Sequence, residues 1–167
     1  DEGLVSLDDP TSRYVPEFDG EKAGITIRQA FSHTSGLPRN AVCAFDRGTT
    51  LAECVESISR LPLMASPGSE FAYGNASMHA VGRVAEVVTG RPWGEVFASR
   101  VAEPLGMRDT DYAGLGETDN PLVAGGARSS IDDYGAFLQM LLDGGEHGGR
   151  RVLSAEAVDE MLEDQTN

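Results

Sequence analysis

The chain has 167 residues, of which 27 are acidic and 13 basic, so its formal net charge at pH 7 is -14. With 40% hydrophobic and 24% charged residues, it has the composition of one globular domain and lies far from that of disordered chains. No stretch approaches the roughly 18 consecutive apolar residues of a membrane-spanning helix, and the start at Asp1 and Glu2 carries no export signal. An acidic surface without clusters of Lys or Arg repels phosphate groups, which excludes nucleic acids and anionic lipids as expected partners. Small molecules and proteins remain as expected partners.

Cys43 and Cys54 are the two cysteines. Two cysteines alone do not make a zinc site, and their spacing is not that of a redox pair. The favoured interpretation is two buried thiols, although a disulfide stays open if the protein is exported. The sequence therefore predicts no metal and no cofactor.

The periodicity of the apolar residues predicts a mainly α-helical chain. Thr26 and Gln29 have the spacing of a capping box, which opens a first, short helix. Thr50 and Glu53 repeat this signature ahead of a second helix, which we expect to end before Pro62. The buried stripe of this second helix consists of Leu51, Val55 and Ile58.

The longest amphipathic segment covers residues 76–89 and ends before Gly90. Its predicted buried face consists of Met78, Val81, Ala85 and Val88. The opposite, polar face is predicted to carry His79, Arg83 and Glu86. His79 has no second ligand one helical turn away, so it is not expected to bind a metal.

Three further helices are predicted in the second half of the chain. One contains Trp93 and Phe97, which we expect to pack in the core, and ends before Pro104. Another carries an apolar stripe that consists of Ile131, Tyr134, Leu138, Leu141 and Leu142. Ser154 can cap a last helix. Strand-like alternation is limited to residues 24–27, so the predicted fold class is mainly α.

The segment from Pro67 to Asn75 is a turn that places a tyrosine and an asparagine just ahead of the helix at 76–89. Tyr73 is a poor base at its ordinary pKa of about 10, so catalytic use needs neighbouring cations that favour the phenolate. Asn75 adds one acceptor and two donors. Taken alone, the triplet also fits a surface tyrosine followed by an asparagine that caps the helix.

Four blocks give this triplet a context: residues 3–10, the His-Thr-Ser-Gly-Leu-Pro sequence at 33–38, the Tyr73-Gly-Asn75 turn, and residues 125–134. In order and spacing they resemble the serine β-lactamase-like superfamily, namely class C β-lactamases, DD-peptidases and family VIII esterases with a penicillin-binding fold. The resemblance implies that Tyr73 is a general base or proton relay for a serine nucleophile. It also implies that Asn75 helps to orient the substrate and the catalytic lysine.

Two other motifs of this superfamily are missing. Lys22 is the only lysine, and Asp19 stands three residues before it, so the sequence has no Ser-x-x-Lys nucleophile motif. His147 begins a His-Gly-Gly sequence that fits the Lys/His-x-Gly motif only superficially, and we interpret it as a turn between two helices. The resemblance therefore implies that residues 1–167 form one helical domain of the α/β β-lactamase/transpeptidase-like fold, with the sheet largely missing and both ends truncated.

Two other motifs are interpreted as carrying no chemistry. His33 and Ser35 stand two residues apart without a third group, so we expect a loop beneath the site rather than a catalytic dyad. The glycosylation sequon that begins at Asn75 is expected to be a chance match. Tyr73 and Asn75 therefore remain the candidate catalytic residues.

The resemblance implies a parent serine hydrolase that transfers acyl groups from β-lactam, D-Ala-D-Ala peptide or ester substrates. The isolated chain lacks a nucleophile and an oxyanion hole, so we expect it to be inactive. The alternative is a non-catalytic module of the same lineage that binds a partner, or forms a homodimer, through the surface left bare by the missing sheet. A third interpretation is an unrelated all-α interaction domain. A cell-envelope or secreted protein is favoured over a cytoplasmic one.

Overall fold

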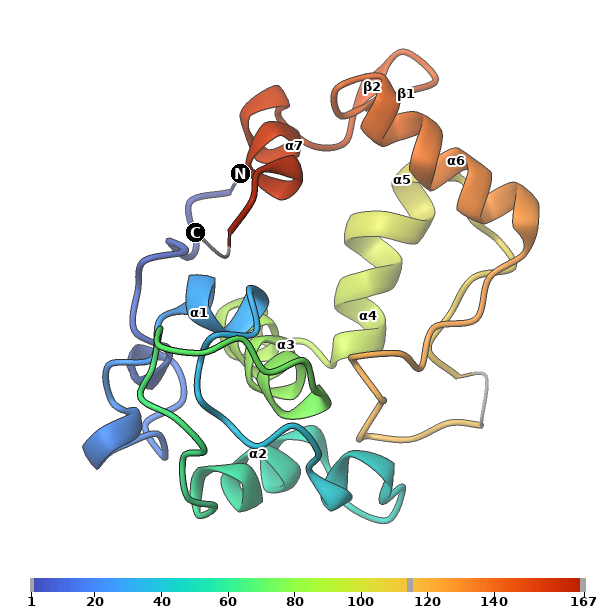
Figure 1. Cartoon of the computed structure of the whole chain (residues 1–167). Helices are drawn as coiled ribbons and strands as arrows, with labels where there is room; N and C mark the ends of the chain where they lie inside the picture. Colours follow the sequence, from blue (N-terminus) through green and yellow to red (C-terminus); the bar gives the residue numbers. More distant parts are fainter. Residues whose placement is uncertain (1, 114–115, 166–167) are drawn as a thin grey trace.

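The computed structural model describes residues 2–113 and 116–165, and most of its secondary structure is helical (Figure 1). The first half of the chain forms α1 (Ile27–Phe31), α2 (Leu51–Ser59) and α3 (Asn75–Thr89). The second half forms α4 (Trp93–Phe97), α5 (Glu103–Leu105), α6 (Ile131–Leu142) and α7 (Ala155–Leu162). Shorter helical turns are η1 (Thr11–Arg13), η2 (Gly20–Lys22), η3 (Val42–Phe45) and the π-helical η4 (Ala98–Ala102), which joins α4 to α5. A two-stranded antiparallel sheet consists of β1 (Glu146–His147) and β2 (Arg150–Arg151).

Side-chain caps fix where several helices begin, as the sequence predicts. The backbone N–H of Gln29 donates to Thr26 Oγ1 at 3.1 Å, and the N–H of Thr26 donates to Gln29 Oε1 at 3.0 Å. Thr50 and Glu53 exchange the same two bonds at 3.1 and 2.8 Å. Ser154 caps α7. Both predicted capping boxes and the Ser154 cap are therefore confirmed.

None of the described helices is long and apolar enough to cross a membrane.

Three local predictions are corrected. Residues 24–27 form no strand: Thr26 makes one isolated bridge to Pro10 and then caps α1. The helical run does not stop before Pro104: η4 continues directly into α5, and Pro104 is the second residue of α5. His147 lies in β1 rather than in the turn, which is made by the following two glycines with φ of 58° and 76°.

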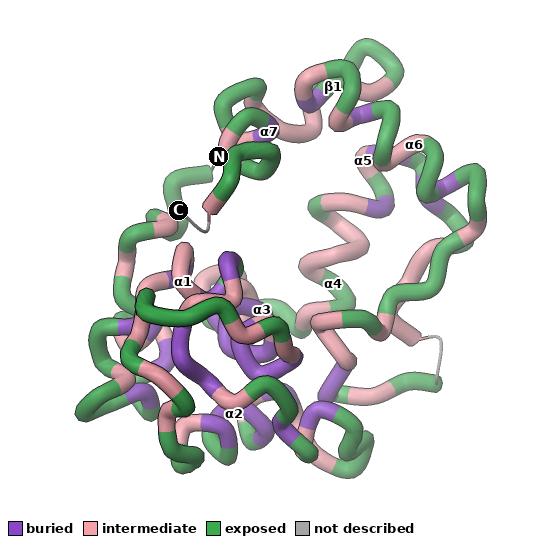
Figure 2. The backbone as a smooth tube through the Cα atoms, in the orientation of Figure 1, coloured by how far each residue is buried: buried purple, intermediate pink, exposed green. Residues whose placement is uncertain are grey.

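The main apolar core lies where α3 packs against α1 and α2, and Figure 2 shows the buried residues concentrated there. Its fully buried members include Phe18, Ile25, Ile27, Leu37, Leu51 and Ile58. A second, smaller cluster joins α5 to α6 and consists of Ala102, Leu105, Met107 and Met140. Trp93 and Phe97 are half-buried against these clusters, with ring centroids 5.5 and 5.0 Å from that of Tyr112. The first half of the chain is thus the better-packed part.

The buried face of α3 differs from the predicted one. His79, which periodicity assigns to the polar face, is 0% exposed, whereas Met78 and Val88 are only partly buried. The reason is that both α1 and α2 pack on α3, so that more than one stripe of this helix is covered. The Nδ1 atom of His79 lies 3.0 Å from the carbonyl oxygen of Asn75, one turn earlier, and donates to it in the tautomer that this contact favours.

Cys43 and Cys54 are joined in a disulfide, so the favoured interpretation of two buried thiols is wrong. The short helix η3 packs against α2 and brings the two Cα atoms to 5.3 Å, which is within the range that disulfides require. Sequence spacing alone does not reveal this approach, because it depends on how the loop folds back onto α2.

The loop after α1 runs alongside the segment that precedes α3. The N–H of Met64 donates to the carbonyl of Gly36 at 2.8 Å, and the N–H of Gly68 donates to that of Thr34 at 2.7 Å. Gly36 has φ of 74°, and a Cβ atom added to it would lie 2.1 Å from the carbonyl oxygen of Ala65. Only glycine permits both this backbone conformation and this approach.

We therefore expect Gly36→Ala to lower the free energy of unfolding by about 2 kcal/mol or more, because it combines left-handed strain with a steric clash. Gly135→Ala is the matched control, since Gly135 lies within α6 with nothing within 4 Å of an added Cβ. It should be neutral or stabilising. Thermal and urea unfolding of both variants measure the difference, and equal stabilities would contradict the account of Gly36.

Burial lowers the pKa of His79, and the hydrogen bond to the Asn75 carbonyl offsets this only in part. The unfolded chain, with a histidine pKa of about 6.5, binds the proton more readily, so this contribution to stability is present above that pH and decreases below it. We expect His79→Gln to reduce the loss of unfolding free energy between about pH 7 and about pH 5.5. An unchanged pH dependence in His79→Gln would refute the assignment.

Candidate active site

Tyr73 is held between two backbone hydrogen bonds. On one side the N–H of Ala72 donates to the carbonyl of His33, and on the other the N–H of Asn75 donates to the carbonyl of Arg39, both at 2.8 Å. Between them, a Cβ atom on Gly74 would lie 2.0 Å from the Arg39 carbonyl oxygen. The glycine between the tyrosine and the asparagine is thus required by a close backbone approach and not by positive φ.

The side chain of Tyr73 stands at the surface. It is 69% exposed, and its ring centroid lies 4.7 Å from that of His33. Its hydroxyl forms no hydrogen bond with any residue that the structure describes. Burial of Tyr73 in the interior, which would contradict a catalytic role, is not observed. That role stays a prediction.

Asn75 is the first residue of α3 and is only 8% exposed. Its Oδ1 accepts a hydrogen bond from the N–H of Ala41 at 2.8 Å. The N-cap of α3 is Gly74, so the interpretation of Asn75 as a capping residue is wrong. Because the Oδ1 atom is used by the loop, the Nδ2 group is the part of the carboxamide that can donate to another partner.

The ring of His33 lies against that of Tyr73, with a tilt of 53° between the two planes. His33 has φ of 58°, a conformation that non-glycine residues rarely adopt, and its Nδ1 is buried without a partner among the described residues. Burial lowers the pKa of His33, which favours the neutral ring. A neutral, half-buried imidazole against Tyr73 acts here as a packing surface.

Ser35 takes no part in a dyad with His33. It is 1% exposed, and its hydroxyl shares a hydrogen bond of 2.8 Å with that of Ser77 on α3. The Oγ atom also accepts a bond from the N–H of Leu37 at 3.2 Å. The structural interpretation of this serine is therefore supported, and sequence reasoning missed Ser77 as its partner because the two are far apart in the chain.

Residues of the first and last of the four motif blocks, 3–10 and 125–134, hold elements of the fold together. Arg28 of α1 pairs with Asp8 at 2.9 Å and with Glu160 of α7. In the last block, Asp133 accepts hydrogen bonds from the N–H of Asp109 at 2.7 Å and from the hydroxyl of Thr110 at 2.8 Å. These residues position segments rather than provide reactive groups.

Tyr73 and Asn75 line none of five cavities on the described residues, which include the groove beside α1 and α3 and a pocket around Trp93 and Tyr112. The candidate site is thus an open surface that carries the exposed phenol of Tyr73 and, beside it, the anchored carboxamide of Asn75. An apolar groove of about 360 Å³ lies elsewhere, between the N-terminal segment, α1 and α3. Its lining includes Leu4, Val5, Phe31, Val84, Val88 and Leu153.

Comparisons with known proteins agree on one family. A beta-lactamase family model matches residues 1–167. The D-alanyl-D-alanine-carboxypeptidase/endopeptidase AmpH of Escherichia coli K12 is 30% identical over 170 residues, which cover 85% of this chain and 44% of that protein. Esterase EstB of Burkholderia gladioli is 33% identical over 129 residues, which cover 66% of this chain and 33% of the esterase.

Solved structures show the same similarity. A Bacteroides dorei protein, provisionally described as a beta-lactamase, superposes with a TM-score of 0.87 at 35% identity and covers 97% of this chain and 50% of its own. A family VIII carboxylesterase shares the fold with a TM-score of 0.81 at 24% identity, over 99% of this chain and 56% of its own. The chain spans less than half the length of the two curated relatives named above. With a family model matched from end to end, the chain belongs to the beta-lactamase family.

Proposed function

We propose that this chain is the helical part of a serine hydrolase that acts by acyl transfer, and that it supplies Tyr73 and Asn75 to the active site. The observation that carries the proposal is an exposed phenol on a backbone fixed at both ends, next to an anchored carboxamide. Such a rigid placement is what a proton-transferring group requires. The relatives named above include a carboxypeptidase and an esterase, and both are hydrolases of acyl compounds.

In this reaction a serine hydroxyl attacks the carbonyl carbon of an amide or ester and forms an acyl-enzyme, while the amine or alcohol leaves. Tyr73 takes the serine proton and passes it toward the leaving group, and Asn75 donates from its Nδ2 group to the substrate. Water then attacks the acyl carbonyl and releases the serine. Backbone N–H groups outside this chain stabilise the oxyanion.

The serine and its lysine partner are proposed to come from polypeptide outside these 167 residues. Lys22, the only lysine, lies in η2 and has no serine three residues before it. The apolar groove beside α1 and α3 supports this view, because it offers a packing surface for further structure, and Phe31 in its lining is 54% exposed.

The substrate is proposed to be a β-lactam, a D-Ala-D-Ala peptide or an ester. Family members share their motifs across these substrates, and selectivity depends on the shape of the surrounding loops. The Cys43–Cys54 disulfide favours an oxidising compartment, so we propose an exported or cell-envelope protein.

A second candidate function is a non-catalytic module that forms a homodimer. Its support is a set of exposed apolar side chains: Leu4, Phe31, Leu142, Met161 and Leu162. Sedimentation equilibrium of the chain measures this, and a monomer at all concentrations would contradict it.

We expect the isolated chain to hydrolyse neither nitrocefin nor p-nitrophenyl acetate above the rate of its Tyr73→Phe variant, because the proposal places the nucleophile and the oxyanion donors outside these 167 residues. Hydrolysis assays with both compounds measure this. Turnover that disappears in Tyr73→Phe would show that the chain carries a nucleophile of its own.

Sequencing the gene on both sides of this segment tests the other half of the proposal, and a Ser-x-x-Lys sequence upstream is expected. In that longer protein, Tyr73→Phe should lower kcat/KM by roughly 10²–10⁴-fold, the usual effect of losing a general acid–base group. Tyr134→Phe is the matched control, since Tyr134 is 53% exposed on α6, and should leave kcat/KM unchanged. Equal activities of the two variants would refute the role of Tyr73.

A further inference from the structure

The helix η3 has little apolar contact to hold it in place. Of its four residues only Ala44 is buried, while Val42 is 87% and Phe45 66% exposed. A short helix with its largest side chains in solvent gains little from the hydrophobic effect. Its position must therefore depend on specific attachments.

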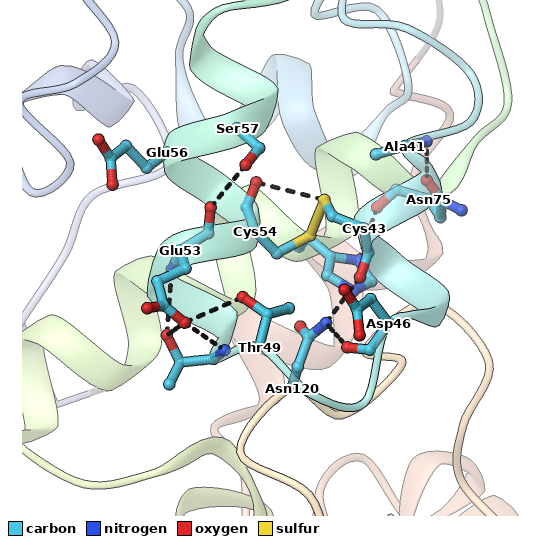
Figure 3. The surroundings of a disulfide bond; sticks show 12 residues. Ala41, Cys43, Asp46, Thr49, Glu53, Cys54, Glu56, Ser57, Asn75 and Asn120 are labelled. Atoms are coloured by element: carbon cyan, nitrogen blue, oxygen red, sulfur yellow. Dashed lines mark hydrogen bonds between the residues drawn. A yellow bond between two sulfur atoms is a disulfide. The ribbon is translucent and has the colours of Figure 1, made fainter.

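Two attachments fix the body of η3, and Figure 3 shows both. Cys43 is bonded to Cys54, which is 0% exposed within α2. The Nδ2 group of Asn120 donates to the carbonyls of Cys43 at 2.7 Å and Asp46 at 2.8 Å. The covalent bond thus ties η3 to the packed core, and the buried amide of Asn120 binds one carbonyl within η3 and the carbonyl of Asp46, the residue that follows η3.

The residues just before η3 reach the candidate active site. The N–H of Ala41 donates to Asn75 Oδ1, and the carbonyl of Arg39 accepts from the N–H of Asn75 (Figure 3 shows the first of these bonds). Ala41 is 1% exposed, so water does not readily replace Asn75 Oδ1 as the acceptor for its N–H. The bond to Ala41 also decides which end of the carboxamide is left free, because it occupies the oxygen.

We propose that the Cys43–Cys54 disulfide is a positioning element for Asn75: by tying η3 to α2, it holds the Ala41 N–H where it orients the Asn75 carboxamide. This inference rests on the proposed function in one respect only, the catalytic role of Asn75. The structural claim, that the disulfide controls the Ala41–Asn75 bond, concerns this chain alone.

Amide hydrogen exchange followed by NMR tests the claim in the full chain. In Cys43→Ala/Cys54→Ala we expect the Ala41 amide to exchange roughly tenfold or more faster, because the closed loop no longer limits opening of η3. The amide of Met140, in the second cluster, should keep its rate. Dithiothreitol gives the same comparison without mutation: it supplies two electrons and two protons to the disulfide and becomes a cyclic disulfide, leaving two thiols.

Two controls separate positioning from general destabilisation. Ile58→Val weakens the same core on α2 but leaves the disulfide intact. In this variant the exchange rate of the Ala41 amide should change by the same factor as the rates of the other core amides. In Asn75→Ala the Ala41 N–H has lost its acceptor, so reduction should add little to its exchange rate. An unchanged Ala41 rate after reduction, or equal acceleration at Ala41 and Met140, would overturn the proposal, as would free thiols at Cys43 and Cys54 in unreduced peptides.

The effect on catalysis is measured in the longer protein that is proposed to contain the Ser-x-x-Lys sequence. Reduction should lower kcat/KM there, and should lower it much less in Asn75→Ala. If exchange at Ala41 responds to reduction but kcat/KM does not, the disulfide still positions Asn75, and the catalytic use of Asn75 is the part that fails.

Discussion

The candidate site depends on two irregular segments that lie against each other through backbone hydrogen bonds. Residues 33–39 supply the acceptors, and the four donors are the N–H groups of Met64, Gly68, Ala72 and Asn75, at 2.7–2.8 Å. Glycines at positions 36 and 74 permit this contact, because an added Cβ would lie 2.1 and 2.0 Å from a carbonyl oxygen of the opposite segment. This pairing fixes the backbone on both sides of Tyr73 and the entry to α3 at Asn75.

The pairing lies on the better-packed half of the molecule. Asn75 begins α3, the helix against which α1 and α2 pack, and Ser77 and His79 continue the same buried region. The site thus has a rigid helix behind it and solvent in front of Tyr73. This division is consistent with the role proposed for Tyr73, because a group that transfers protons needs a fixed backbone and an accessible side chain.

Polar contacts do much of the positioning outside the core. The buried amide of Asn120 and the carboxylate of Asp133 each bind two groups from distant segments. Arg28 links the N-terminal segment to α7, but these charges are partly exposed, and such pairs contribute little to stability. Because the net charge is -14, we expect ionic strength to act on this chain mainly by screening the repulsion between its surface charges.

The local structure follows from the amino-acid sequence alone. Hydroxyl and carboxamide or carboxylate side chains three residues apart predicted where α1 and α2 begin, because a cap needs only neighbouring residues. The motif blocks pointed to the family and to Tyr73 and Asn75. Tertiary structure alone decided that His79 is buried, that Cys43 and Cys54 are joined, and that Ala41 binds the Asn75 side chain. Each of these depends on segments far apart in the chain approaching one another, and helical periodicity or residue spacing carries no information about such approaches.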